Sequence, residues 1–194
     1  MQRNPFLIFV VALLFSASYD LNAEILQVTV TWNSGVCDPK CSNLLGEKFK
    51  KMKQVEEVSV NPSSGVAVIK WKPDAQFSYH LIKTNMQMVG VGVNEIRVRV
   101  RGKARGQGKN VSLVSLEDNT SFILVSPIMP NPDSLILYPN PYLRELDPKL
   151  REKILLEAKE DKVMVIEGPL YQPARSPPLQ LVVERIQIEK KKKN

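Results

Sequence analysis

The chain has two cysteines, Cys37 and Cys41, within the stretch Asn-Ser-Gly-Val-Cys-Asp-Pro-Lys-Cys at residues 33–41. Thiolates at this spacing can hold a soft cation such as Cu(I), Hg(II) or Zn(II). In an oxidising compartment the same two thiols can instead join as a disulfide, if the side-chain geometry permits it. A third outcome is two thiols that do not pair. The residue types alone leave these three interpretations open.

The residues between the cysteines predict the start of a helix. Asp38 can cap the free amides of the first turn, and Pro39 suits the first helical position. Cys41 would then lie in that turn, where unpaired amides and the helix dipole favour a thiolate. Asp38 opposes a second negative charge at this place, unless it caps the helix or binds the metal itself.

Residues 1–23 have the features of a secretory signal peptide. A single positive charge, Arg3, precedes an apolar run of about a dozen residues, and small residues follow the run. The run is shorter than the roughly 20 residues that a membrane-spanning helix needs. We expect cleavage after Ala23 and a secreted or periplasmic protein that begins near Glu24. The alternative is an uncleaved N-terminal anchor.

The formal net charge of +7, from 27 Lys and Arg against 20 Asp and Glu, favours anionic partners. Outside the cytoplasm these would be lipid head groups, envelope polymers or a protein with an acidic surface. Residues 191–194 form a basic tail, which we interpret as solvated, with contact to an anionic envelope surface as the alternative. Two cysteines are too few for a disulfide-rich scaffold.

Residues 24–100 predict one α+β domain. Alternating apolar and polar residues indicate strands at 25–32 and 96–100, and apolar residues at helical spacing indicate helices after Pro39 and at 78–89. Two runs rich in β-branched residues predict a hairpin between the helices, at 55–60 and 66–71. Arginines alternate with apolar residues in the last strand, at Arg97, Arg99 and Arg101. The order β-α-β-β-α-β is that of the ferredoxin-like plan.

A strand, a cysteine-bearing loop at a helix start, and this element order resemble the heavy-metal-associated domain family of copper chaperones and mercury-binding periplasmic proteins. The family motif is Gly-Met-x-Cys-x-x-Cys, and residues 35–41 stand at the seven matching positions. Gly35 and Cys41 fall in register, whereas Val36 and Asp38 replace the Met and the first Cys. The resemblance implies a soft-metal site at Cys37 and Cys41.

A third ligand for such a site would have to come from elsewhere. The single histidine, His80, begins the second predicted helix, and the antiparallel plan places that end of the helix away from the cysteine loop. We therefore expect His80 to be a surface or otherwise satisfied residue. Met88 is better placed, although a Met at helical spacing is usually part of a core.

Residues 101–190 predict a second domain that follows the first without a flexible linker. Strands are expected at 110–116 and 121–125, and a helix begins at Pro148 behind the capping Asp147. Two further strands are expected at 162–168 and 179–188. Three strands, a helix and two strands form the order of a five-stranded OB barrel. The stretch Val-Met-Val-Ile-Glu-Gly after the helix resembles small OB domains of bacterial exported proteins.

These features favour a binding protein over an enzyme. With one histidine, sited away from the cysteines, we expect no Ser-His-Asp chemistry. We also expect no nucleic-acid partner, because the strands lack the stacking aromatics that such binding needs. The leading hypothesis is a protein that binds and transfers a soft metal through Cys37 and Cys41. The competing hypothesis is an interaction module whose two cysteines form a disulfide.

Overall fold

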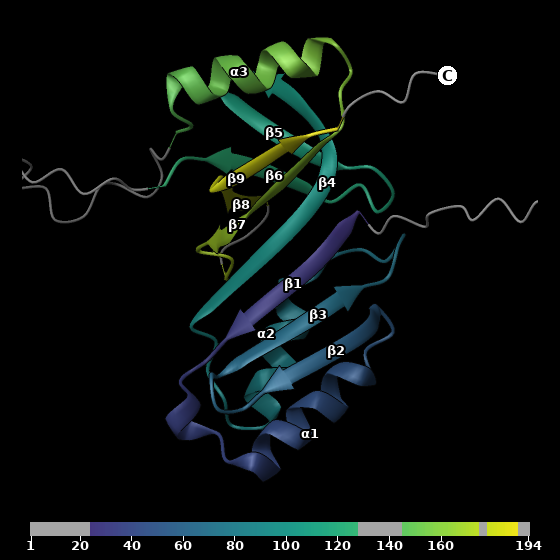
Figure 1. Ribbon diagram of the computed structural model, residues 1–194, viewed down its shortest axis with the longest axis vertical. Helices are drawn as coiled ribbons and strands as arrows, with labels where there is room; N and C mark the ends of the chain where they lie inside the picture. The colour runs from purple at the N-terminus through teal and green to yellow at the C-terminus, as the bar shows by residue number, and fades with distance from the viewer. Residues whose placement is uncertain (1–23, 128–144, 175–177, 190–194) are drawn as a thin grey trace, which may run out of the picture.

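The computed structural model describes residues 24–127, 145–174 and 178–189. Within these ranges three α-helices and nine strands form an α+β fold (Figure 1). The expected signal peptide at 1–23 and the basic tail at 191–194 lie outside the described residues. So does most of the proline-rich segment between the sixth strand and the third helix.

The first half of the molecule is a four-stranded antiparallel sheet with two helices. Its strands follow the spatial order β2-β3-β1-β4. The elements are β1 (Ile25–Thr31), α1 (Pro39–Lys50), β2 (Val55–Asn61), β3 (Val66–Trp71), α2 (Tyr79–Met88) and β4 (Glu95–Gln107). One face of the sheet packs against both helices, because the apolar residues of the alternating strands and those of the helices belong to one buried cluster. The β-α-β-β-α-β order expected from the sequence is present.

The second half is a closed five-stranded barrel with one helix. The barrel order is β4-β5-β6-β8-β7, and pairing between β4 and β7 closes it. Its further elements are β5 (Asn110–Ser115), β6 (Ser121–Val125), α3 (Pro148–Lys159), β7 (Met164–Tyr171) and β8 (Leu179–Val182), with β9 (Arg185–Ile188) at the edge of β7. All pairings are antiparallel except that between β6 and β8. Helix α3 lies across one end of the barrel strands (Figure 1).

The expectation of a single last strand at 179–188 is wrong. The strand is interrupted after Val182, and β9 begins at Arg185. The two residues at the break donate their amides to different strands: Val183 N–H to Val125 O at 2.8 Å, and Glu184 N–H to Glu167 O at 3.1 Å. The chain must turn here because β8 pairs with both β6 and β7, whereas β9 pairs with β7 alone.

Strand β4 belongs to both halves. Residues 95–100 pair with β1 along one edge, and residues 97–102 pair with β7 along the other. Further along, residues 102–107 pair with β5. The domain boundary that the sequence predicts after residue 100 therefore falls inside a continuous strand. In Figure 1, β4 runs from the lower sheet to the top of the barrel.

Aromatic side chains also connect the halves. The ring of Phe77, from the loop before α2, lies 5.4 Å from Trp71 and 6.1 Å from Phe122 between ring centroids. Its backbone amide donates a hydrogen bond to Asp118 Oδ2 at 3.1 Å. Trp71 and Phe122 are fully buried. The two halves thus share one core, which contributes to stability as a unit.

A buried carboxyl group lies where β1 enters this shared region. Glu24 is 3% exposed, and its Oε1 lies 3.4 Å from Arg101 Nη1. Burial raises the pKa of the Glu24 carboxyl to about 7, although the charge of Arg101 acts in the opposite direction. Arg101 itself also pairs with Glu189, at 2.7 and 2.9 Å. The stability of the fold should therefore depend on the protonation of Glu24.

We expect Glu24→Gln to flatten the pH dependence of stability between about pH 4.5 and pH 7. The folded state holds the Glu24 proton more tightly than the unfolded chain, whose pKa is near 4.5. The contribution of this group is therefore full below pH 4.5 and is lost as pH rises through 7. Urea unfolding of both proteins at several pH values measures the effect, at most about 3 kcal/mol.

The control for this comparison is Glu56→Gln, which removes a carboxylate from an exposed ion pair with Lys70. Such pairs contribute roughly 0 to 1 kcal/mol, so this variant should keep the wild-type profile. If Glu24→Gln also kept the wild-type profile, the carboxyl would not be buried as described.

A second prediction concerns the close approach of β7 to the corner between β8 and β9. A Cβ atom at Gly168 would lie 1.8 Å from the backbone oxygen of Val182. Gly168→Ala should lower the free energy of unfolding by about 3 kcal/mol or more, because backbone rather than a flexible side chain must move. Gly92→Ala is the matched control, since no atom lies within 4 Å of its Cβ position. Equal unfolding midpoints for both variants would contradict the packing at Gly168.

Candidate functional site at the cysteine loop

The loop between β1 and α1 is built by short-range hydrogen bonds. The Asn33 side chain accepts a bond from Gly35 N–H at 3.0 Å and begins a 3-10 turn at Ser34–Val36. Cys37 follows this turn directly. Helix α1 then begins at Pro39, and Asp38 Oδ1 accepts a bond from the Cys41 amide at 2.7 Å. The helix start predicted from Asp38 and Pro39 is confirmed.

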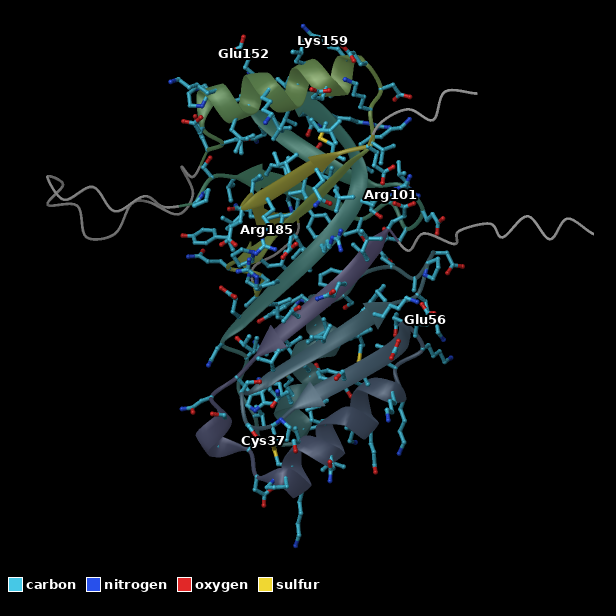
Figure 2. The ribbon with its side chains drawn as sticks, in the orientation of Figure 1. Cys37, Glu56, Arg101, Glu152, Lys159 and Arg185 are labelled. Carbon is cyan, nitrogen blue, oxygen red and sulfur yellow. A yellow bond between two sulfur atoms is a disulfide. The ribbon has the colours of Figure 1, made fainter. Side chains whose placement is uncertain are left out.

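The two cysteines are joined as a disulfide. Their Sγ atoms lie 2.12 Å apart and their Cα atoms 5.3 Å apart. Cys37 is labelled in Figure 2 at the lower end of the molecule, next to the start of α1. Of the three outcomes that the sequence left open, the structure contains the disulfide.

The disulfide is partly covered by the rest of the sheet-and-helix unit. Cys37 is only 5% exposed and belongs to the hydrophobic core, and Cys41 packs against that core. The Sγ of Cys41 lies 3.9 Å from the carbonyl oxygen of Val89, just after α2. This is a packing contact, because a disulfide sulfur carries no hydrogen to donate. The disulfide therefore joins Cys37 to the first turn of α1 and packs against the end of α2.

Two other loops lie at the same end of the sheet. Trp32 N–H donates to Gly65 O at 2.9 Å, which joins the cysteine loop to the turn between β2 and β3. Asn94 N–H donates to Thr31 O at 2.9 Å and brings in the segment after α2. Gly65 has φ +62°, and a Cβ there would meet Trp32 O at 2.3 Å, so the turn needs glycine. The cysteine loop, the turn between β2 and β3 and the segment after α2 therefore meet at one end of the sheet.

The two residues considered as a third ligand behave differently. His80 lies in the first turn of α2, next to the ring of Tyr79 at 5.7 Å between ring centroids. His80 is therefore at the opposite end of α2 from Val89. The ten residues of the helix separate its two ends by about 15 Å. Met88 is 64% exposed and precedes Val89, so it is not a core residue. The prediction that His80 lies away from the cysteines is confirmed.

The surface around the disulfide combines apolar and basic side chains. Val36 is 60% exposed, like Met88, and flanks the disulfide in sequence. Lys40 faces solvent between the two cysteines. The other exposed lysines, Lys50, Lys51 and Lys53, lie at or beyond the far end of α1, about 15 Å from the disulfide along the helix. The surface beside the disulfide thus presents apolar contact area and one lysine.

Metal binding would require reduction of this bond, because thiolates and not disulfide sulfurs are the ligands. Within the described ranges no group of three or more His, Cys, Asp and Glu side chains is placed to share a metal ion. A reduced pair would therefore offer two sulfur donors, which suits Cu(I) or Hg(II) better than Zn(II) with its preference for four ligands. The Asp38 carboxylate is occupied as the helix cap.

A second concentration of polar side chains, on the open face of the sheet, was not recognised as a site from the sequence. It lies over β1, β4, β7 and β9 and includes Arg97 and Arg99. The alternation of arginines in residues 96–101 was the available signal. Their partners come from β7 and β9, about 70 to 90 residues later in the chain, and sequence spacing could not show that pairing.

Comparisons with known proteins identified no relative of this chain. A scan against protein-family models, a search of curated proteins and a search of solved structures each gave no match. Among the described helices, none is long and apolar enough to cross a membrane.

The disulfide should stabilise the fold by a measurable amount. Replacing both cysteines, as Cys37→Ser with Cys41→Ser, should lower the free energy of unfolding by about 2 kcal/mol, the loop-entropy value for so short a loop. Urea unfolding measures this. Reductant should lower the stability of the wild-type protein by a similar amount and leave the double variant unchanged. A wild-type protein indifferent to reductant would show that the bond does not form.

Proposed function

We propose that the protein is an exported, non-enzymatic binding protein that docks an anionic partner at the disulfide-fixed end of its first half. The observation that carries this proposal is the Cys37–Cys41 disulfide, which fixes the loop beside the exposed side chains of Val36 and Met88. A loop that is already ordered costs less conformational entropy when it binds.

The charge around this loop sets the kind of partner. Lys40 lies between the two cysteines in the chain, within the first turn of α1, and further lysines follow on the solvent side of that helix. Positive charge on a surface steers oppositely charged partners and increases their rate of association, and Lys40 is the lysine that lies beside the loop itself. The partner that fits is therefore a protein with an acidic surface that carries an apolar contact for Val36 and Met88.

The fold supports this proposal at a finer level. The order β2-β3-β1-β4 with two helices on one face is that of a ferredoxin-like domain. The barrel order β4-β5-β6-β8-β7, with its parallel β6–β8 pairing and a helix between β6 and β7, is that of an OB fold. We propose that the first half is a heavy-metal-associated-like module and that the barrel is a second interaction domain.

A second candidate function is soft-metal binding by the reduced cysteines. The observation that favours it is that both sulfurs already lie together at a loop end, with Cys41 in the first turn of α1. Two electrons and two protons from an external dithiol, which would itself be oxidised to a disulfide, would convert the Cys37–Cys41 bond to two thiols. A Cu(I) or Hg(II) ion would then displace the thiol protons.

Thiol titration followed by metal titration decides between these two candidates. For the proposed docking function we expect no free thiol, and no stoichiometric Cu(I) or Hg(II) uptake, in protein prepared without reductant. Uptake of one ion per chain, lost in the double Cys→Ser variant, would replace this function with metal binding.

The docking surface itself can be tested with an oligoglutamate peptide as the acidic probe. We expect amide chemical-shift changes to centre on Val36, Lys40 and Met88, and Lys40→Glu to weaken binding at least fivefold. Lys109→Glu is the matched control, because Lys109 is an exposed lysine in the turn between β4 and β5. Equal weakening by the two variants would show only general charge attraction and would contradict the proposal.

A further inference from the structure

The open face of the sheet extends across both halves of the molecule. Because β4 pairs with β1 on one edge and with β7 on the other, and β9 pairs with β7, these four strands form one continuous surface. A single row of cross-strand neighbours crosses it: Gln27, Arg99, Glu167 and Arg185. Side chains in such a row stand on the same face and can act together.

This row crosses a polar hollow with a volume of about 250 Å³. The lining side chains include three arginines, one carboxylate, an amide and a hydroxyl: Arg97, Arg99, Arg185, Glu167, Gln27 and Thr29. Its volume is below the roughly 300 to 1,000 Å³ of sites for drug-sized ligands. The hollow therefore suits a small ligand, or the polar end of a larger one.

The three arginines differ in whether a carboxylate pairs with their guanidinium group. Arg97 is bound by Glu184, through a short contact, and by Glu95 at 3.4 Å. Arg185 lies 3.5 Å from Glu167. Among the described residues no carboxylate lies within ion-pair distance of Arg99, whose side chain reaches only Gln187 Oε1, at 3.5 Å.

Arg99 is half-buried, so its charge is partly removed from water without an ionic partner. A guanidinium in this situation presents a planar set of donors that matches the two oxygens of a carboxylate or a phosphate. Glu95, Glu184 and Glu167 pair with the other two arginines of the hollow, so the positive charge that lacks a direct ionic partner is that of Arg99. An anionic ligand would supply the missing counter-charge.

The neighbouring side chains are arranged to assist such a ligand. The Gln27 amide Nε2 donates to Thr29 Oγ1 at 3.1 Å. The Thr29 hydroxyl therefore accepts one hydrogen bond from within the protein and keeps its own hydrogen available to donate. A hydroxyl donor beside a guanidinium fork is a suitable pair for an oxyanion.

We propose that this hollow is a binding site for a small oxyanion group, a carboxylate or a phosphate, with Arg99 as its principal donor and Thr29 as a second donor. The site uses no residue of the cysteine loop. A test of this site is therefore independent of a test of the function proposed above.

The test titrates the protein with inorganic phosphate and, separately, with acetate, at constant ionic strength. Binding is followed by the chemical shifts of the arginine side-chain N–H groups. We expect saturable shifts at Arg99 with at least one anion, and the stronger of the two identifies the preferred group. Absence of any saturable chemical-shift change up to about 10 mM anion would overturn the proposal. It would mean a binding free energy weaker than roughly −2.7 kcal/mol.

Two variants locate the site. Arg99→Gln leaves no carboxylate without its partner and should weaken binding at least tenfold. Arg105→Gln is the matched control, because Arg105 is an exposed arginine further along the same strand and outside the hollow. We expect its affinity to stay within twofold of wild type. Equal weakening by both variants would indicate general charge attraction and would overturn the site.

A third variant distinguishes loss of the binding site from loss of folding. Thr29→Val keeps the shape of the side chain and removes its hydroxyl, and Val is well suited to a strand. We expect a threefold or greater loss of affinity with an unchanged unfolding midpoint. Wild-type affinity in this variant would remove Thr29 from the site, and wild-type affinity in Arg99→Gln would overturn the proposal as a whole.

Discussion

The pairing of β4 along both of its edges is the constraint on which the rest of the molecule depends. Its first residues complete the sheet beneath α1 and α2, and its last residues begin the barrel beneath α3. Between them, residues 97–100 serve both halves at once. Because the hydrogen bonds of one strand hold two sheets, neither half can shift relative to the other without breaking main-chain pairing. Phe77, packed between Trp71 and Phe122, adds side-chain contact across the same junction.

The two candidate sites use this framework differently. The disulfide lies at the end of the sheet, where three loops meet. There a covalent bond ties the loop to the start of α1, and Cys41 packs beside Val89. The polar hollow lies in the middle of the face, where rigid strands fix the spacing of Arg97, Arg99 and Arg185. A site on paired strands needs no such bond to keep its geometry.

Local patterns predicted the elements well, because each depends on residues close in sequence. The caps at Asp38 and Asp147, the alternation in β1 and the order of the barrel elements could all be inferred from the sequence. The redox state of the cysteines could not, since it depends on the side-chain geometry of the loop that carries them. The break between β8 and β9 was missed because it is imposed by pairing with β6 and β7. The hollow was missed for the same reason, as Glu167 and Arg185 reach it from distant strands.

The first and last described residues meet at one side chain. Glu24 approaches Arg101 from one side, and Glu189 approaches it from the other. Residues 24 and 189 lie close enough for a short linker to join them, and such a chain could be opened instead in an exposed turn. The turn between β4 and β5 around Gly108 is such a place. The strand pairing therefore brings residues 24 and 189 to one point of the fold, and the order in which the elements are connected could change while their pairing stays the same.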